Sequence, residues 1–193
     1  MKDEIRQILA ETARLHEILA HAPQEILDGV RMLVRVMKDG GTLYVMGNGG
    51  SAADAQHLAG ELIGRFEMER PAFPCVALTT DTSILTAVGN DYGMQDVFAR
   101  QVEGLVTERD VVLGISTSGQ SGNVVEALRK AKDLGAKTIA LTGQDGGPMA
   151  EISDAAIRVP SDHTARIQEA HATIIHILCG ILERELSSES PSC

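Results

Sequence analysis

The stretch TLYVMGNGGSAADAQHLAGEL, residues 42–62, decides the fold of this chain. It begins with a short β-rich apolar run, passes through a glycine-rich turn and continues as a helical pattern. A strand, a glycine turn and a helix in that order form the repeating unit of parallel α/β sheets. The stretch therefore predicts a layered α/β domain.

Similar β-rich runs recur along the chain, with helical stretches between them. They are PCVAL (74–78), DVVLGIS (110–116), KTIALT (137–142) and AAIRV (155–159). Strands that are apolar on both faces and alternate with helices indicate a parallel sheet that is covered on both sides. We expect a three-layer α/β/α domain with about five strands.

The ends of the chain predict helices around this sheet. Apolar residues recur at helical spacing before and after Pro23, so residues 1–40 predict two helices. We expect one domain over 1–193, with an α/β core over 41–186 that closes with a long C-terminal helix and a flexible tail over 187–193. The N-terminal helices have no sheet of their own to cover, so we expect their apolar stripe to pack subunits together.

Charge and composition exclude several classes of partner. The chain has 27 acidic and 17 basic side chains, a formal charge of -10, whereas binding to duplex nucleic acid needs clustered Lys and Arg. No run of about 18 apolar residues predicts a membrane span, and we expect a cytoplasmic protein. Cys75, Cys179 and Cys193 lack metal-type spacing and are expected to be reduced thiols.

Ligands of parallel sheets bind beyond the carboxyl ends of the strands, which directs attention to the loop GNGGSAADAQH, residues 47–57. Its glycines let the backbone approach a ligand, and we expect Ser51 to cap the following helix. Gly47, Gly49 and Ala52 match the G-x-G-x-x-A pattern of dinucleotide folds, but no acidic residue is well placed after the next strand. A Walker A loop is excluded because no Gly-Lys-Ser/Thr follows.

A second loop, STSGQSGN, is rich in hydroxyl side chains and lies between a predicted strand and a predicted helix. Its hydroxyl residues are Ser116, Thr117, Ser118 and Ser121. Hydroxyls and backbone amides at a helix N-terminus bind phosphate without Lys or Arg. We expect a phosphorylated small molecule here, and the alternative is a serine-rich turn without a ligand.

Titratable side chains gather on two predicted helices. His57 and Glu61 are four residues apart after the first loop, so they share one helix face at a spacing that suits two ligands of one ion. In the stretch RIQEAHATIIHIL, residues 166–178, Gln168 and His176 are separated by about 12 Å along the helix axis. A site that contains both lies alongside the helix between them or takes them from different subunits.

Several blocks of sequence together carry a family resemblance. GNGGSAADAQHLAGEL, TAVGNDYG, GISTSGQSGN, LTGQDGG and RIQEAHATIIHIL occur in this order and resemble the phosphoheptose isomerases of the sugar isomerase (SIS) domain family. The resemblance implies a homotetramer with active sites between subunits. It also implies conversion of the ketose D-sedoheptulose 7-phosphate into D-glycero-D-manno-heptose 7-phosphate, which leads to activated heptose for lipopolysaccharide or another surface polysaccharide.

The resemblance also assigns the site residues. The substrate-binding positions are Asn48, Gly49, Gly50, Ser51, His57, Glu61, Asn90, Asp91, Ser116, Thr117, Ser118, Ser121 and Gln168. One zinc ion per subunit is expected, with the ligands His57, Glu61, Gln168 and His176. We expect Glu61 and His176 to be catalytic and to share the acid/base work of an aldose-ketose isomerisation through an enediol intermediate.

Two rival interpretations belong to other functional classes. Relatives of the family include a non-catalytic regulator that binds the bacterial replication initiator, and proteins that only sense sugar phosphates; the presence of Glu61 and His176 favours an enzyme. An arabinose phosphate isomerase usually carries appended regulatory domains, for which 193 residues leave no room. A dinucleotide enzyme requires an acidic residue that is not well placed after the second predicted strand of this chain.

Overall fold

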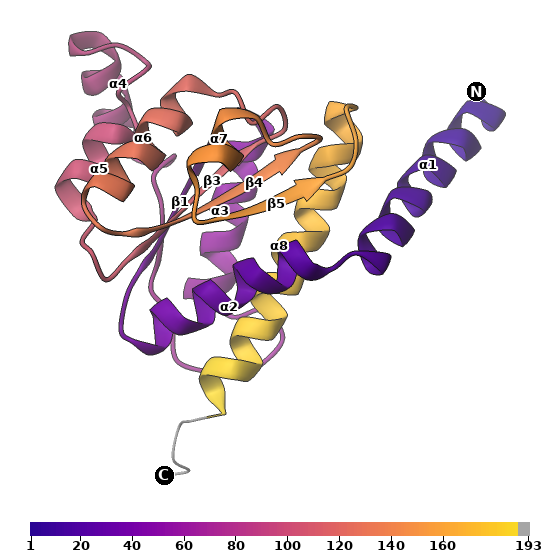
Figure 1. Cartoon of the computed structure of the whole chain (residues 1–193), viewed down its shortest axis with the longest axis horizontal. Helices are drawn as coiled ribbons and strands as arrows, with labels where there is room; N and C mark the ends of the chain where they lie inside the picture. The colour runs from indigo at the N-terminus through magenta and orange to yellow at the C-terminus, as the bar shows by residue number, and fades with distance from the viewer. Residues whose placement is uncertain (189–193) are drawn as a thin grey trace.

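The computed structural model describes residues 1–188, which form a three-layer α/β/α arrangement (Figure 1). The central sheet has five strands in the order β2-β1-β3-β4-β5, and all neighbouring strands are parallel. The strands are β1 (Leu43–Gly47), β2 (Cys75–Ala77), β3 (Val111–Ser116), β4 (Lys137–Gly143) and β5 (Ala155–Val159). The predicted fold class and the five strands are confirmed.

Eight helices accompany the strands in the described part of the chain. They are α1 (Lys2–His21), α2 (Gln24–Lys38), α3 (Gly50–Ile63), α4 (Thr82–Asp91), α5 (Ala99–Leu105), α6 (Gly122–Asp133), α7 (Gly147–Ile152) and α8 (Thr164–Ser187). Because α8 includes Ser187, the predicted tail begins too early, and residues 189–193 of it lie outside the described residues. None of these helices has the length and apolar character that a membrane span requires.

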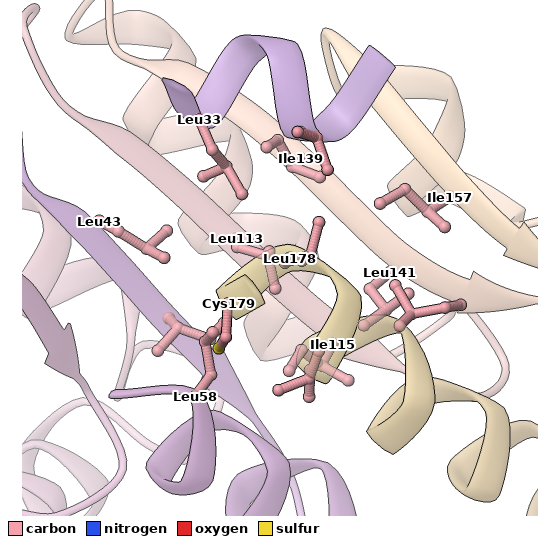
Figure 2. Packing of buried hydrophobic residues seen from close by; sticks show 14 of the residues in the cluster. Leu33, Leu43, Leu58, Leu113, Ile115, Ile139, Leu141, Ile157, Leu178 and Cys179 are labelled. Carbon is pink, nitrogen blue, oxygen red and sulfur yellow. The ribbon is translucent and has the colours of Figure 1, made fainter. Parts of the chain in front are cut away.

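The strands bury both of their faces, as their sequence predicts. Leu113 and Ile115 of β3 face the core formed with α2, α3 and α8, whereas Val112 faces the core formed with α5, α6 and α7. Figure 2 shows the first core, where Leu178 of α8 and Leu58 of α3 lie near these strand residues. Because both faces of the strands are buried, the strands are continuous apolar runs in the amino-acid sequence.

The helix α2 differs from our expectation because it does cover the sheet. Its residues Val30 and Leu33 are buried, and Gly29 lies so close to β5 that a Cβ there would be 2.8 Å from Ile157 Cδ1. The premise that both N-terminal helices lack a sheet to cover is therefore wrong for α2. In contrast, α1 packs against α8 and leaves an apolar stripe exposed, formed by Ile5, Ile8, Leu9 and Ile18.

Three titratable side chains are buried in uncharged form. Burial raises the pKa of Cys75 and of Cys179 to about 12, so both are protonated thiols, and neither is in a disulfide. The expectation of reduced thiols is confirmed for these two residues, while Cys193 lies outside the described residues. On α8, burial lowers the pKa of His171 to about 4. Its ring lies 3.0 Å from the Thr142 carbonyl and joins α8 to β4.

A buried ion pair joins the segment after α3 to α8. Arg70 Nε donates to Glu183 Oε1 over 2.9 Å, and both side chains are only 1% exposed. Glu183 also accepts hydrogen bonds of 2.8–2.9 Å from the backbone N–H groups of Phe66, Glu67 and Met68. Burial alone raises the pKa of Glu183, but these N–H groups and Arg70 outweigh it and hold the pKa below its ordinary value.

We expect the substitution Glu183→Gln to lower the free energy of unfolding by about 3–5 kcal/mol, because it leaves the Arg70 guanidinium buried without its counter-charge. Chemical denaturation at pH 7 measures this loss. Because the folded-state pKa of Glu183 is depressed, its contribution is complete above its ordinary pKa of 4.5 and is lost as the pH falls below that value. The free energies of unfolding of the wild type and the variant should therefore become equal in acid.

Glu185→Gln is the matched control, because Glu185 is exposed on the same helix. We expect it to change the free energy of unfolding by less than about 0.5 kcal/mol. Equal losses in the two variants would contradict the assignment of the ion pair as a specific anchor.

Candidate active site

The two glycine- and serine-rich loops lie side by side at the carboxyl edge of the sheet, because they follow the neighbouring strands β1 and β3. Asn48 Nδ2 donates to Asn123 Oδ1 over 2.8 Å, and Asn123 Nδ2 donates back to Asn48 Oδ1 over 3.0 Å. This reciprocal pair joins the first loop to the start of α6. Asn123 is not among the site residues predicted from the sequence, and its side chain is buried although its type is polar.

In the second loop, three of the four predicted hydroxyl groups converge. Ser116 Oγ lies 2.9 Å from Ser121 Oγ and 3.4 Å from Ser118 Oγ, and Thr117 lies between them in the chain. Ser121 is the N-cap residue of α6, but its side chain does not cap the helix. The positive end of α6 is therefore left available to an anion beside these hydroxyls.

A glycine makes the tight turn of this loop possible. Gly119 has φ +65, and a Cβ at this position would be 2.0 Å from the carbonyl oxygen of Gly146. Any other residue at this position would push the second loop, residues 116–123 and called the serine loop below, away from the loop after β4.

The first loop begins its helix earlier than we expected. The N-cap residue of α3 is Gly49, whose φ of +56 turns the chain into the helix at Gly50. Ser51 is therefore buried inside the first turn, and its predicted capping role is wrong. A Cβ on Gly50 would be 2.3 Å from Gln168 Nε2, so the glycine leaves room for this amide of α8.

Further along the same two helices, His57, Glu61 and His176 come together. His57 Nε2 lies 3.0 Å from Glu61 Oε1 and 3.4 Å from His176 Nε2. The rings of His57 and His176 meet edge to face, with centroids 5.0 Å apart and planes at 82°. The side chains of His57 and Glu61 are 41% and 25% exposed, so small molecules can reach this cluster.

Both contacts of His57 involve the same nitrogen. A carboxylate accepts a hydrogen bond, so His57 Nε2 donates its proton to Glu61 Oε1. His176 Nε2 lies 3.4 Å from the same atom, and the tautomers of the two rings decide which nitrogen donates in that contact. Two imidazoles and a carboxylate, which are groups that ligate cations and transfer protons, therefore meet around one atom.

Gln168 and His176 both face α3 of the same chain. Gln168 lies against Gly50, and His176 contacts His57 seven residues further along α3, which corresponds to about 10.5 Å. The sequence left open whether the two residues belong to one subunit's site or to two. Within this chain, they lie along a single seam between α3 and α8.

Asp54 is a further polar residue of this seam that is not among the site residues predicted from the sequence. It lies on the same face of α3 as Gly50, His57 and Glu61, because these positions are spaced by three or four residues. Its Oδ2 atom is buried and has no hydrogen-bond partner in the described structure. Burial raises the pKa of Asp54, and the neighbouring His57 counteracts this effect in part.

Two predicted substrate-binding residues are not joined to this cluster. Asn90 and Asp91 are exposed at the end of α4, where Asn90 Nδ2 donates to Asp91 Oδ1 over 2.8 Å. Within residues 1–188, no hydrogen bond connects either of them to the two loops or to α8. Their assignment to the site rests on the family resemblance.

Of the predicted zinc ligands, His57, Glu61 and His176 suit the metal in type and lie together, whereas Gln168 lies against Gly50 at the other end of the seam. Imidazole and carboxylate groups are common ligands of zinc, and adjacent ligand atoms on a tetrahedral ion are about 3.3 Å apart, close to the 3.0 and 3.4 Å distances around His57 Nε2. However, no group of three His, Cys, Asp or Glu side chains in residues 1–188 is arranged to hold an ion. Binding would require these side chains to rotate toward a common centre.

Comparison with known proteins gives a consistent result. Residues 9–143 match the family model described as "SIS domain". A phosphoheptose isomerase of Geotalea daltonii is 53% identical over 189 residues, which cover 96% of this chain and 98% of that protein. Solved structures of phosphoheptose isomerases from Francisella tularensis and Neisseria gonorrhoeae superpose with TM-scores of 0.90 and 0.89. They are 42% and 40% identical, and the alignments cover 94% and 95% of this chain and 97% and 98% of theirs.

The matches extend over nearly the whole chain and include both the sheet and the α3–α8 seam, so the predicted resemblance is confirmed. The chain belongs to the phosphoheptose isomerase family of SIS domain proteins.

Proposed function

We propose that this chain converts D-sedoheptulose 7-phosphate into D-glycero-D-manno-heptose 7-phosphate through an enediol, as the first step in making activated heptose for lipopolysaccharide or another surface polysaccharide. The observation that carries the proposal is the contact of His57 with both Glu61 and His176. We place the reaction in the cytoplasm, where the free thiols of Cys75 and Cys179 would stay reduced.

The serine loop is suited to the phosphate end of the substrate. Ser116, Ser118 and Ser121 present their hydroxyl groups together at the uncapped N-terminus of α6. Hydroxyl donors and the helix dipole stabilise phosphate oxygens without a basic side chain. The Asn48–Asn123 pair fixes this loop relative to Gly49 and Gly50, whose exposed backbone faces the reacting end.

The reaction needs two proton transfers. One proton moves between C1 and C2, and another moves between their oxygens, with negative charge developing on the oxygens of the enediolate. Glu61 and His176 share this work, one serving carbon and the other oxygen. Gln168, held at the start of α3, donates an amide hydrogen to a substrate oxygen.

We expect Glu61→Gln and His176→Gln each to reduce kcat about 10²- to 10⁴-fold, because each removes a group that transfers a proton. Substrate binding should remain measurable by calorimetry. Conversion is followed by NMR, which distinguishes the ketose signals from those of the aldose.

Glu69→Gln and His21→Gln are matched controls, because both residues are exposed and lie outside the cluster. They should retain the wild-type rate. A near-normal rate in either active-site variant would remove that residue from the catalytic assignment. If the wild type itself produced no aldose, the isomerase proposal would fail in favour of a sugar-phosphate-binding regulator.

We further propose one zinc ion per subunit, held by His57, Glu61, Gln168 and His176. The ion would polarise the carbonyl and hydroxyl oxygens of the substrate as a Lewis acid. The contacts of His57 with Glu61 and His176 support this proposal, since two imidazoles and a carboxylate that lie together could coordinate a cation.

Metal analysis of the purified protein should find one zinc per chain, and His57→Gln should reduce that content several-fold. His21→Gln serves as the control and should retain its zinc. Wild-type protein that has no zinc after chelation but keeps its full rate would contradict a role for the ion.

We also propose a homotetramer with active sites between subunits. The exposed apolar stripe on α1 supports this arrangement, because apolar side chains such as Leu9, 64% exposed, gain stability when a second subunit covers them. Sedimentation should give a mass of four times the 20.6 kDa chain.

Leu9→Asp should shift the protein to smaller species by placing a charge in the interface. Leu105→Asp, at an exposed leucine on α5, is the matched control and should leave the assembly intact. A wild-type monomer would contradict the proposal.

A further inference from the structure

We propose that Phe66 is a positioning residue for His176, and that the buried Arg70–Glu183 pair holds Phe66 in place for this purpose. The inference rests on the proposed function, in which His176 transfers a proton, and it adds to that site a residue without any titratable group. Only the tertiary structure brings these two residues together, because Phe66 belongs to the segment between α3 and β2, more than 100 residues before His176.

The first observation is the geometry around the His176 ring. The phenyl ring of Phe66 stacks on the imidazole, with centroids 5.4 Å apart and planes at 26°. His57 meets the same imidazole edge to face. His176 is exposed, and His57 provides its side chain's one hydrogen-bond contact within residues 1–188. The two ring contacts therefore restrict an imidazole that would otherwise sample several rotamers.

The second observation is the way the Phe66 backbone is held. Glu183 accepts the Phe66 N–H over 2.8 Å, and the next two N–H groups of the segment over 2.9 Å. Glu183 is seven residues after His176 on α8, so both residues lie on one face of that helix. Gly180 lies between them, and a Cβ there would be 3.6 Å from the Phe66 ring, so this ring lies over the glycine.

The third observation connects the same anchor to the other proposed catalytic residue. Arg70, the partner of Glu183, donates to the backbone carbonyls of Glu61 and Leu62 over 2.8 Å. These carbonyls belong to the last turn of α3, where a positive charge is favourable. One buried ion pair thus holds the backbone of Glu61 and, through Phe66, the ring of His176.

This arrangement has a direct chemical consequence. Proton transfer requires the donor and acceptor atoms to stay within hydrogen-bond reach of the substrate, and a displacement of about 1 Å can cost about 10²-fold in rate. A ring stacked on His176 limits its rotation without offering it a competing hydrogen bond. An aliphatic side chain would fill the same volume but would not present a flat face.

The test compares Phe66→Leu with Phe66→Tyr and with Phe98→Leu. Phe98 is buried in the core on the other face of the sheet, and it contacts neither His176 nor the Arg70–Glu183 pair. We expect Phe66→Leu to lower kcat about 10- to 100-fold with KM within about twofold of the wild type. Phe66→Tyr keeps a ring and should restore kcat, and Phe98→Leu should keep kcat even where it lowers thermal stability.

A second readout needs neither substrate nor turnover. In protein labelled with ¹³C at histidine Cε1, the His176 signal is assigned by its loss in His176→Gln. Phe66→Leu removes the ring current of the stacked phenyl group, so the His176 proton should shift downfield, whereas Phe66→Tyr and Phe98→Leu should leave it in place. An unchanged His176 signal in Phe66→Leu would overturn the proposal.

The kinetic and spectroscopic results separate the possible failures. A shifted His176 signal together with an unchanged kcat would overturn the positioning role, because the stacking contact would then have no effect on the reaction. A loss of kcat that Phe66→Tyr does not restore would also overturn it, since packing volume alone would be responsible. A wild type without isomerase activity would reject the proposed function, and the NMR comparison would still decide whether Phe66 orients His176.

Discussion

The buried ion pair between Arg70 and Glu183 is the contact on which the geometry of the site depends. Two charges that are 1% exposed are tolerated because each is neutralised by the other and hydrogen-bonded to backbone groups. Those backbone groups belong to the last turn of α3 and to the segment that follows it, while Glu183 itself belongs to α8. The pair therefore fixes the end of one helix against the other, and the side chains of the candidate site line the seam between them.

A net acidic chain can still bind a phosphorylated substrate, because the recognition is local. The serine loop offers three converging hydroxyl groups and the free positive end of α6, and neither depends on the overall charge of -10. The reciprocal amide contact between Asn48 and Asn123 joins this loop to the neighbouring glycine loop. Adjacent parallel strands thus bring the two loops to the same edge of the sheet, where the proposed substrate would place its phosphate and its reacting end.

The chemistry at that edge depends on how protons are distributed among His57, Glu61 and His176. A single imidazole nitrogen faces both a carboxylate and a second imidazole. These are the types of group that transfer protons in an aldose-ketose isomerisation. The same types of group are common ligands of zinc. The ring contacts of His176 with Phe66 and His57 restrict the orientation of its imidazole within this cluster.

Much of this protein follows from sequence alone. Apolar runs alternating with helical patterns determined the parallel sheet, because strands buried on both faces need no polar positions. The spacing of His57 and Glu61 determined that they share a helix face, since helix geometry is local. The sequence predicts Ser51 as the cap of α3, but the helix begins earlier because Gly49 adopts a positive φ that turns the chain into it. The packing of α2 on β5, the pairing of Asn48 with Asn123 and the stacking of Phe66 on His176 were decided only by tertiary structure. These contacts join residues that are far apart in the chain. Their energies depend on how whole helices pack against the sheet and not on any local sequence pattern.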